Sequence, residues 1–150
     1  MKTGLVSKAV ATACLGLALQ SAPSWAADTS PETLSVVYWG AGDCGPCALW
    51  SKTERKQEFL AEAKALGVRL VEVQRPRVAD PLSHYRWPKE DTALMRSYAK
   101  HQYKPSPLTP AFDFVCRGEL ALRLEGLADW DSFWKRSLRQ QVKQCQASSG

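Results

Sequence analysis

Two cysteines separated by two residues, in the segment Cys44-Gly45-Pro46-Cys47, are the residues of this chain best placed to do chemistry. An apolar, β-branched run at 34–39 precedes them, and a helical pattern over 48–66 follows. Cysteine reacts as its thiolate, which the N-terminus of a helix stabilises through free N–H groups and partial positive charge. The spacing therefore predicts a pair that can close and reopen a disulfide. The alternatives are a structural disulfide or half of a zinc site, although the sequence has no second Cys-x-x-Cys or His-x₃₋₅-His to complete one.

The first 26 residues have the pattern of an export signal. Lys2 and Lys8 form a positively charged start, and residues 9–19 form an apolar stretch too short to cross a bilayer comfortably. Ser24-Trp25-Ala26 then places small residues at the two positions that a signal peptidase reads. We therefore expect cleavage after Ala26 and a soluble, periplasmic protein that begins at Ala27.

Export changes how the cysteines are interpreted, because disulfides persist in the periplasm and are rare in the cytosol. Cys14 would be removed with the signal; a lipid-anchored Cys14 is the alternative, but most of the apolar run follows that residue rather than preceding it. The remaining cysteines are even in number and could form two bridges: Cys44, Cys47, Cys116 and Cys145.

Length and charge bound the remaining possibilities. Residues 27–150 suit one domain with a single core. Loss of Lys2 and Lys8 would lower the formal charge from +5 to +3, and the excess is spread along the chain. Such a charge gives no reason to expect nucleic acid as a partner. No other segment is apolar enough to predict insertion into a membrane.

Periodicity predicts an alternation of strands and helices. Residues 34–39 and 68–73 read as buried strands joined by the helix over 48–66, with Gly67 as its C-cap, which argues for two parallel strands. The proline-containing segment 74–89 reads as a long surface loop. A helix over 90–101, a hairpin of strands 111–116 and 119–125, and a final helix capped by Asp129 and ending near Cys145 follow.

This order of elements, with Cys-x-x-Cys opening the first helix, resembles the thioredoxin family from about residue 34 to residue 145. Tyr38-Trp39 is similar to the aromatic pair that ends the active-site strand of thioredoxin, and Cys44-Gly45-Pro46-Cys47 is identical to its redox tetrapeptide. Thr109-Pro110 is similar to the family's cis-proline site. The resemblance implies an α/β thioredoxin fold, βαβ–α–ββα, with a central four-stranded mixed sheet flanked by helices.

The resemblance also implies roles for these residues. Cys44, at the exposed start of the helix, would attack a substrate disulfide, and the more buried Cys47 would resolve the mixed disulfide. Thr109 and a cis Pro110 would bind an extended substrate and leave no room for a metal ion, so no cofactor is expected. An ordinary trans proline before a strand is the alternative for Pro110, because few X–Pro bonds are cis.

Three departures from thioredoxin stand close to the motif. The small loop 40–43 is one residue longer, and Asp43 replaces a tryptophan before the first cysteine. A carboxylate there would disfavour a thiolate at Cys44. The buried acid that precedes the aromatic pair in thioredoxin is matched by Val37, and Glu72 could take its place as a proton acceptor, although a glutamate at a strand edge is more often solvated.

The path of the chain in such a fold predicts a second disulfide. The strand over 111–116 runs away from Pro110, so Cys116 lies at its far end, and the last helix is long enough to bring Cys145 to the same end. A Cys116–Cys145 bridge would tie that helix to the sheet. Two buried thiols that pack as small apolar residues are the alternative.

The leading functional hypothesis is a periplasmic thiol–disulfide oxidoreductase acting on protein thiols and disulfides. Gly45-Pro46 resembles reducing thioredoxins and Thr109 resembles disulfide isomerases, but the dimerisation domain of those isomerases is missing. A monomeric reductase or thiol carrier, supplied with electrons by a membrane thiol donor, is therefore favoured over an oxidase. The alternatives are copper or zinc handling through Cys44, Cys47 and His84, and a non-catalytic adaptor that docks a partner through residues 85–87.

Overall fold

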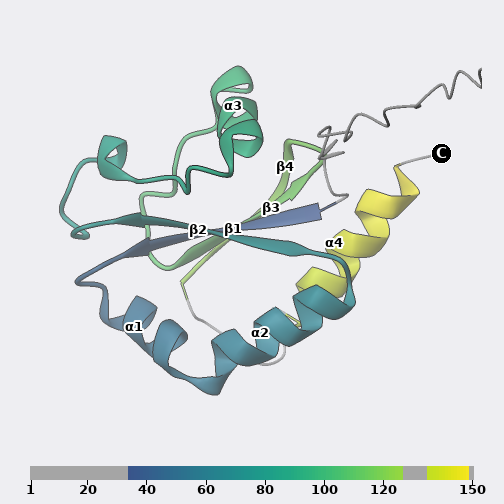
Figure 1. Ribbon diagram of the computed structural model, residues 1–150, viewed down its shortest axis with the longest axis horizontal. Coiled ribbons are helices and arrows are strands. Elements are labelled where there is room, and N and C mark those ends of the chain that lie inside the picture. Colours follow the sequence, from purple (N-terminus) through teal and green to yellow (C-terminus); the bar gives the residue numbers. More distant parts are fainter. Residues whose placement is uncertain (1–33, 127–134, 149–150) are drawn as a thin grey trace, which may run out of the picture.

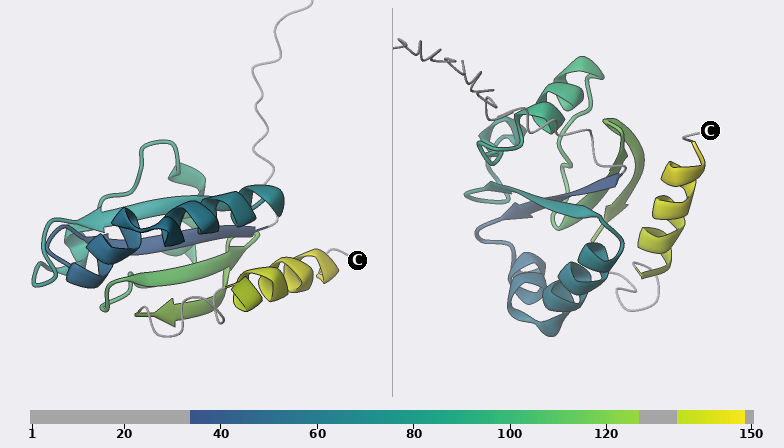
Figure 2. Two further views of the ribbon diagram at one scale, coloured as in Figure 1. Left: turned by 90° about the horizontal axis from the view of Figure 1, so that it is seen from below. Right: turned by 45° about the vertical axis from the view of Figure 1, so that its right-hand side comes forward.

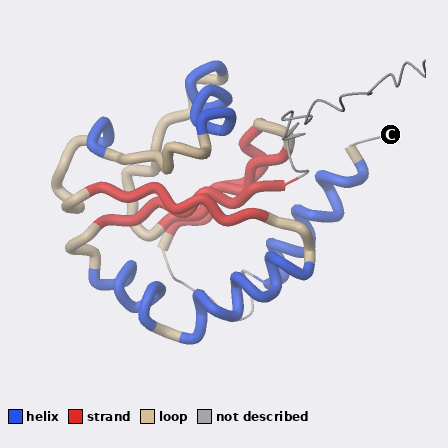
Figure 3. Tube along the Cα trace, viewed as in Figure 1, coloured by secondary structure: helices blue, strands red, loops and turns tan. Residues whose placement is uncertain are grey.

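The computed structural model describes residues 34–126 and 135–148, and within them a single mixed sheet forms the centre of the protein. The strand order is β2-β1-β3-β4, with β1 parallel to β2 and the other neighbours antiparallel. The sheet separates the helices into two layers (Figures 1 and 3). The elements in chain order are β1 (Leu34–Ala41), α1 (Gly45–Lys52), α2 (Glu54–Ala65), β2 (Arg69–Arg75), η1 (Leu82–His84), α3 (Thr92–Lys100), β3 (Ala111–Cys116), β4 (Glu119–Glu125) and α4 (Lys135–Ala147).

The continuous apolar sequence of β1 is explained by burial on both faces of the sheet. Alternate side chains of a strand point to opposite faces. Val36 and Tyr38 pack with α1, α2 and α4, whereas Val37 and Trp39 pack with α3 and the segment that precedes it. Figure 2 shows α4 lying along the same side of the sheet as α2. The predicted four-stranded mixed sheet flanked by helices, βαβ–α–ββα, is confirmed.

The prediction of one helix over 48–66 was wrong, because the segment forms two helices. Thr53 is extended (φ −98°, ψ 167°) and separates α1 from α2. The first helix begins earlier than expected, at Gly45, because Cys44 serves as its N-cap and Pro46 occupies a first-turn position that needs no N–H donor. The Cys-x-x-Cys motif thus opens the first helix, as expected.

The segment 74–89 is more ordered than the predicted loop. β2 continues to Arg75, a 3₁₀ turn forms at η1, and the Arg86 N–H donates to the Gln74 carbonyl (2.8 Å) in an isolated antiparallel bridge. Tyr85 and Trp87 contact Trp39, with ring centroids 4.9 and 5.5 Å away. Because α3 is short, these aromatic side chains complete the cover of its face of the sheet.

Several predictions about the remaining elements can be compared with the structure. The third helix begins at Thr92 rather than residue 90, and the Arg117-Gly118 turn has positive φ at both residues (51° and 87°), as a two-residue hairpin requires. In α4 the apolar side chains of Leu138, Val142 and Cys145 recur at helical spacing and are buried. The proposed export signal with its cleavage site after Ala26, the start of the mature domain, and the Asp129 cap lie outside the described residues.

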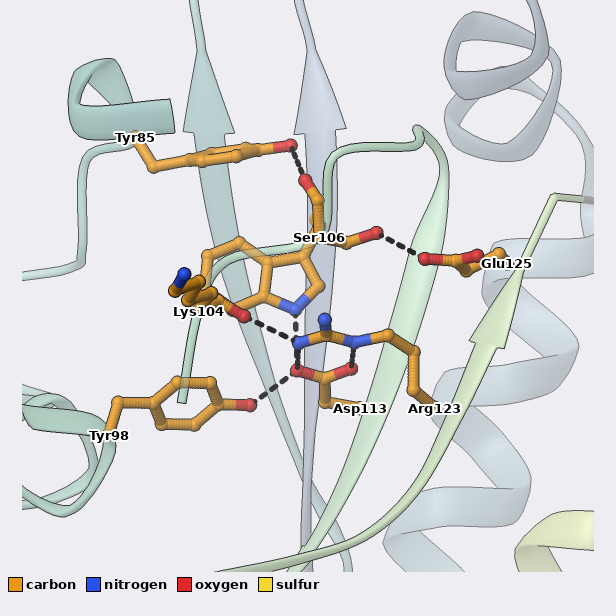
Figure 4. A network of polar contacts seen from close by, with 8 residues as sticks. Tyr85, Tyr98, Lys104, Ser106, Asp113, Arg123 and Glu125 are labelled. Carbon is orange, nitrogen blue, oxygen red and sulfur yellow. Dashed lines mark hydrogen bonds and ion pairs between the residues drawn. The ribbon is translucent and has the colours of Figure 1, made fainter. Parts of the chain in front are cut away.

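A buried ion pair ties the α3 face of the sheet together (Figure 4). Asp113 of β3 is fully buried and accepts from Arg123 Nε–H (2.6 Å) and Nη2–H (2.7 Å). The Trp39 indole N–H (2.8 Å) and the Tyr98 hydroxyl (2.7 Å) also donate to this carboxylate. Four donors compensate the cost of burying the charge, and Arg123 in turn donates to the Lys104 carbonyl (2.8 Å).

Candidate active site

The Cys44–Cys47 disulfide lies where β1 gives way to α1. The two Cα atoms are 5.1 Å apart, and Cys44 Sγ accepts a hydrogen bond from the Cys47 backbone N–H (3.1 Å). Cys44 is the N-cap of α1, so its sulfur occupies the place where a helix offers unpaired N–H groups and partial positive charge. The same arrangement would stabilise a Cys44 thiolate after the disulfide is reduced.

The expected difference in exposure between the two cysteines is absent. Cys44 is 5 % exposed and Cys47 is 4 % exposed, and both belong to the core between the sheet and α1. The expectation of an exposed Cys44 was therefore wrong for this disulfide form, because capping turns its sulfur back over the first helical turn. Position on the helix, not exposure, distinguishes the first cysteine from the second.

Thr109 and Pro110 lie at the same end of the sheet as the cysteines. The peptide between them is cis, as predicted, and the Pro110 carbonyl accepts from Gly126 N–H (2.7 Å). The next residue, Ala111, pairs with Trp39, which places the start of β3 beside the end of β1. The sequence-predicted site residues Cys44, Cys47, Thr109 and Pro110 thus gather around one edge of the sheet.

Asp43 has a partner that the sequence did not indicate. Its Oδ1 accepts from the backbone N–H of Val78 (2.7 Å) in the segment after β2. Gly42 donates to the carbonyls of Arg75 (3.0 Å) and Pro76 (3.1 Å) beside it. The loop before Cys44 is therefore fastened to residues 75–78, and the only sequence signal for this contact was the run of small residues preceding Asp43.

The positions related to the buried acid of thioredoxin lie on opposite faces of the sheet. Val37 packs in the core beneath α3. Glu72 pairs in register with Tyr38 on the side that α1 and α2 cover, and its carboxylate forms an ion pair with Lys56 (2.7 Å). Glu72 is on the cysteine side of the sheet, and its role as a proton acceptor stays a prediction.

Tyr38 and Tyr98 have shifted pKa values for different local reasons. Burial, assisted by the nearby Glu72 carboxylate, raises the pKa of Tyr38 to about 12. Burial, followed by the Asp113 charge, raises the pKa of Tyr98 further. Tyr38 packs edge-on against Trp50 of α1, with ring centroids 5.2 Å apart. The neutral, protonated Tyr38 is therefore packed against the helix that carries Cys47.

The residues of the two alternative readings, a metal site and an adaptor surface, can be located in the structure. Within residues 34–126 and 135–148, no three His, Cys, Asp or Glu residues gather as metal ligands would. His84 is exposed in η1. Tyr85 is buried, with its hydroxyl donating to the Ser106 carbonyl (3.2 Å), so it cannot dock a partner as an adaptor surface would require; only Arg86 of that trio is exposed.

The second disulfide lies at the opposite end of the sheet. Cys116 pairs in register with Leu34, the first residue of β1, and is bonded to Cys145 of α4 with the Cα atoms 5.6 Å apart. Arg117 donates to the Cys145 (3.2 Å) and Ser148 (2.9 Å) carbonyls at the end of α4. This bridge is separated from Cys44 by the length of the sheet.

None of the helices in the described part of the chain is long and apolar enough to span a membrane.

Comparison with known proteins gives structural likenesses only. No family model and no curated protein matches the sequence. The fold is similar to the reduced periplasmic thioredoxin SoxS from Paracoccus pantotrophus, at 22 % identity over 74 % of this chain and 97 % of that one, with a TM-score of 0.43. It is also similar to a putative thiol:disulfide interchange protein DsbE from Chlorobium tepidum (20 % identity, 76 % and 80 % covered, TM-score 0.45). Such distant likenesses carry no argument about activity.

Proposed function

We propose that this protein is a thiol–disulfide oxidoreductase that exchanges disulfides with protein substrates through Cys44 and Cys47. The observation that carries the proposal is a closed Cys-x-x-Cys disulfide at the N-terminus of α1, at the same edge of the sheet as Thr109-Pro110. A disulfide of neighbouring residues at a helix N-terminus can open without disturbing the sheet. Its position also favours the thiolate that exchange requires.

In the reducing direction, the Cys44 thiolate attacks one sulfur of a substrate disulfide. The substrate S–S bond breaks, and its other sulfur leaves as a thiolate that takes up a proton. Cys47 then loses its proton and attacks Cys44 Sγ, which releases the second substrate sulfur as a thiol and closes the Cys44–Cys47 disulfide. Two electrons pass from the cysteine pair to the substrate.

We further propose that the protein works in the periplasm, as a monomer, and as a reductase or thiol carrier rather than an oxidase. The charged and apolar pattern before Ala26 supports export. A reductant in an oxidising compartment needs renewed electrons, so a membrane thiol donor would reduce the Cys44–Cys47 disulfide after each cycle. The reduction potential tests the direction: a value of about −270 mV supports a reductase, and one of about −120 mV would contradict it.

The activity itself is tested by insulin reduction with dithiothreitol as electron source. The wild-type protein should accelerate the reaction, and Cys44→Ala should lower the rate to that of dithiothreitol alone, because no attacking thiolate remains. Cys116→Ser/Cys145→Ser, measured below its unfolding temperature, serves as the matched control and should retain activity. A Cys44→Ala variant as active as wild type would overturn the proposal. A Cys47→Ala variant should trap substrates as mixed disulfides on Cys44.

A further inference from the structure

The loop that leads from β1 to Cys44 (residues 42–44), called the redox loop below, lies between two other segments because of the order of the strands. β1 lies between β2 and β3, and its last residue, Ala41, pairs with Arg75, while Trp39 pairs with Ala111. The loop leading to Cys44 therefore leaves the sheet between residues 76–80, which follow β2, and residues 107–110, which precede β3. Figure 1 shows the segments that follow β1 and β2 at the same edge of the molecule.

Residues 76–80 are held against the redox loop by contacts that depend on two residues before Cys44. The Asp43 carboxylate accepts the Val78 N–H (2.7 Å), and Gly42 donates to the Pro76 carbonyl (3.1 Å). The approach at Gly42 leaves no room for a side chain, since a Cβ there would lie 2.7 Å from the Pro76 oxygen. Asp43 is thus a specific acceptor that positions this segment.

Arg75 joins the same segment to the one before Thr109. Arg75 is 4 % exposed as a residue. Its guanidinium lies over the Tyr85 ring (4.9 Å to the centroid) and donates to the carbonyls of Asp80 (3.0 Å) and Pro107 (3.1 Å). One buried arginine therefore connects residues 76–80 with residues 107–110. The planar fork of its N–H groups fixes the two carbonyls relative to each other.

Each of the two segments presents a large apolar side chain to solvent. Val78 is 45 % exposed and Leu108 is 56 % exposed, on opposite sides of the redox loop. We infer that residues 76–80 form a second wall of the substrate site, opposite the first wall that Thr109 and Pro110 form. Asp43 holds this second wall to the redox loop, and Val78 contacts an apolar side chain of a protein substrate. This inference rests on the proposed function and makes Asp43 a positioning residue for protein disulfides.

Comparison of Asp43→Asn with Asp43→Ala separates position from charge. Both variants remove the negative charge beside Cys44, but only asparagine keeps a side-chain oxygen that can accept the Val78 N–H. Each protein, reduced beforehand, is mixed with oxidised insulin or with hydroxyethyl disulfide, and the rate constant of Cys44–Cys47 closure is measured in a single turnover. Glu90→Ala, which removes an exposed carboxylate elsewhere, is the control.

The two variants should react equally fast with hydroxyethyl disulfide, which is too small to touch a second wall. With insulin, Asp43→Ala should be slower than Asp43→Asn by about fivefold, because the wall is no longer held in place. Amide hydrogen exchange at Val78 should accelerate in Asp43→Ala and stay slow in Asp43→Asn. Val78→Ser should lower the insulin rate alone, whereas Met95→Ser, which alters an exposed side chain on α3, should change neither rate.

The outcomes distinguish this inference from the proposed function. If both Asp43 variants react equally with insulin, or if alanine slows both substrates alike, the second wall is overturned while the oxidoreductase stands. If the wild-type protein reduces neither substrate, the proposed function fails and the inference fails with it.

Discussion

The Cys44–Cys47 disulfide closes a short ring within one helical turn at one end of the sheet, whereas the Cys116–Cys145 disulfide joins β3 to α4 at the other. The first pair is 3 residues apart in sequence and the second pair 29. A bridge that closes a longer loop removes more conformational freedom from the unfolded chain. We therefore expect the redox end to open and close with little effect on folding, and the other end to stabilise the domain.

The surroundings of the two disulfides differ in the same sense. At the redox end, Asp43 and Arg75 hold loops to one another through backbone N–H groups and carbonyls, so side chains there set the position of segments that a substrate would meet. At the other end, the Cys116–Cys145 bridge attaches the end of α4 to β3. Arg117 attaches it a second time, because its guanidinium donates to the Cys145 and Ser148 carbonyls. Under the proposed function, one end is arranged around a bond that opens and closes, and the other around a bond that stays closed.

The largest expected loss of stability comes from the buried Asp113 network on the α3 face of the sheet, which lies between the two disulfides. Asp113→Asn should lower the free energy of unfolding by roughly 3–5 kcal/mol, because the Arg123 guanidinium loses its charged partner inside the protein. Urea unfolding measures the loss. Arg139→Gln is the control, since it breaks the exposed Arg139–Glu62 pair and should cost less than about 1 kcal/mol. Equal losses in both variants would show that the buried network has no special weight.

The comparison between the two disulfides is tested by removing the structural one. Cys116→Ser/Cys145→Ser should lower the free energy of unfolding by roughly 2–4 kcal/mol, because the unfolded chain regains the freedom of a long loop. Reduction of the Cys44–Cys47 bond in this variant should cost clearly less, as followed by urea unfolding with and without reductant. A larger loss on opening the short ring would reverse the assignment of the two ends.

The smallest expected effect is an alkaline loss of stability near the redox end. Tyr38 has a pKa of about 12 in the folded protein against an ordinary value of 10.0, so the unfolded chain releases this proton first. The contribution of Tyr38 to the free energy of unfolding is therefore intact below pH 10 and is lost progressively as the pH rises from 10 to about 12. Unfolding at several pH values measures this slope. Tyr38→Phe should make this slope shallower, with the remaining slope arising from Tyr98, whose pKa is also raised by burial. An unchanged slope would contradict the role given to Tyr38.

Much of the fold could be predicted because its signals are local. The apolar run of β1, the two-residue turn at Arg117-Gly118 and the stripe of α4 each follow from a pattern within a few residues. The break at Thr53 escaped prediction, because residues 51–58 contain no glycine or proline that would mark the end of a helix. The burial of Tyr85 also escaped, since nothing near it in sequence indicates that α3 is too short to cover Trp39.

The sequence by itself determined the cysteine pair, its place at the start of a helix, and the order of strands that brings Thr109-Pro110 to the same edge. These features depend on residue type, spacing and the alternation of elements, which are written along the chain. Only the tertiary structure decided that Cys44 is as buried as Cys47, that Asp43 binds Val78, and that Arg75 joins two loops. The Arg75–Pro107 and Asp43–Val78 contacts join residues 32 and 35 positions apart in the sequence. The burial of Cys44 depends on neighbours from other elements, and no local sequence pattern specifies contacts of this kind.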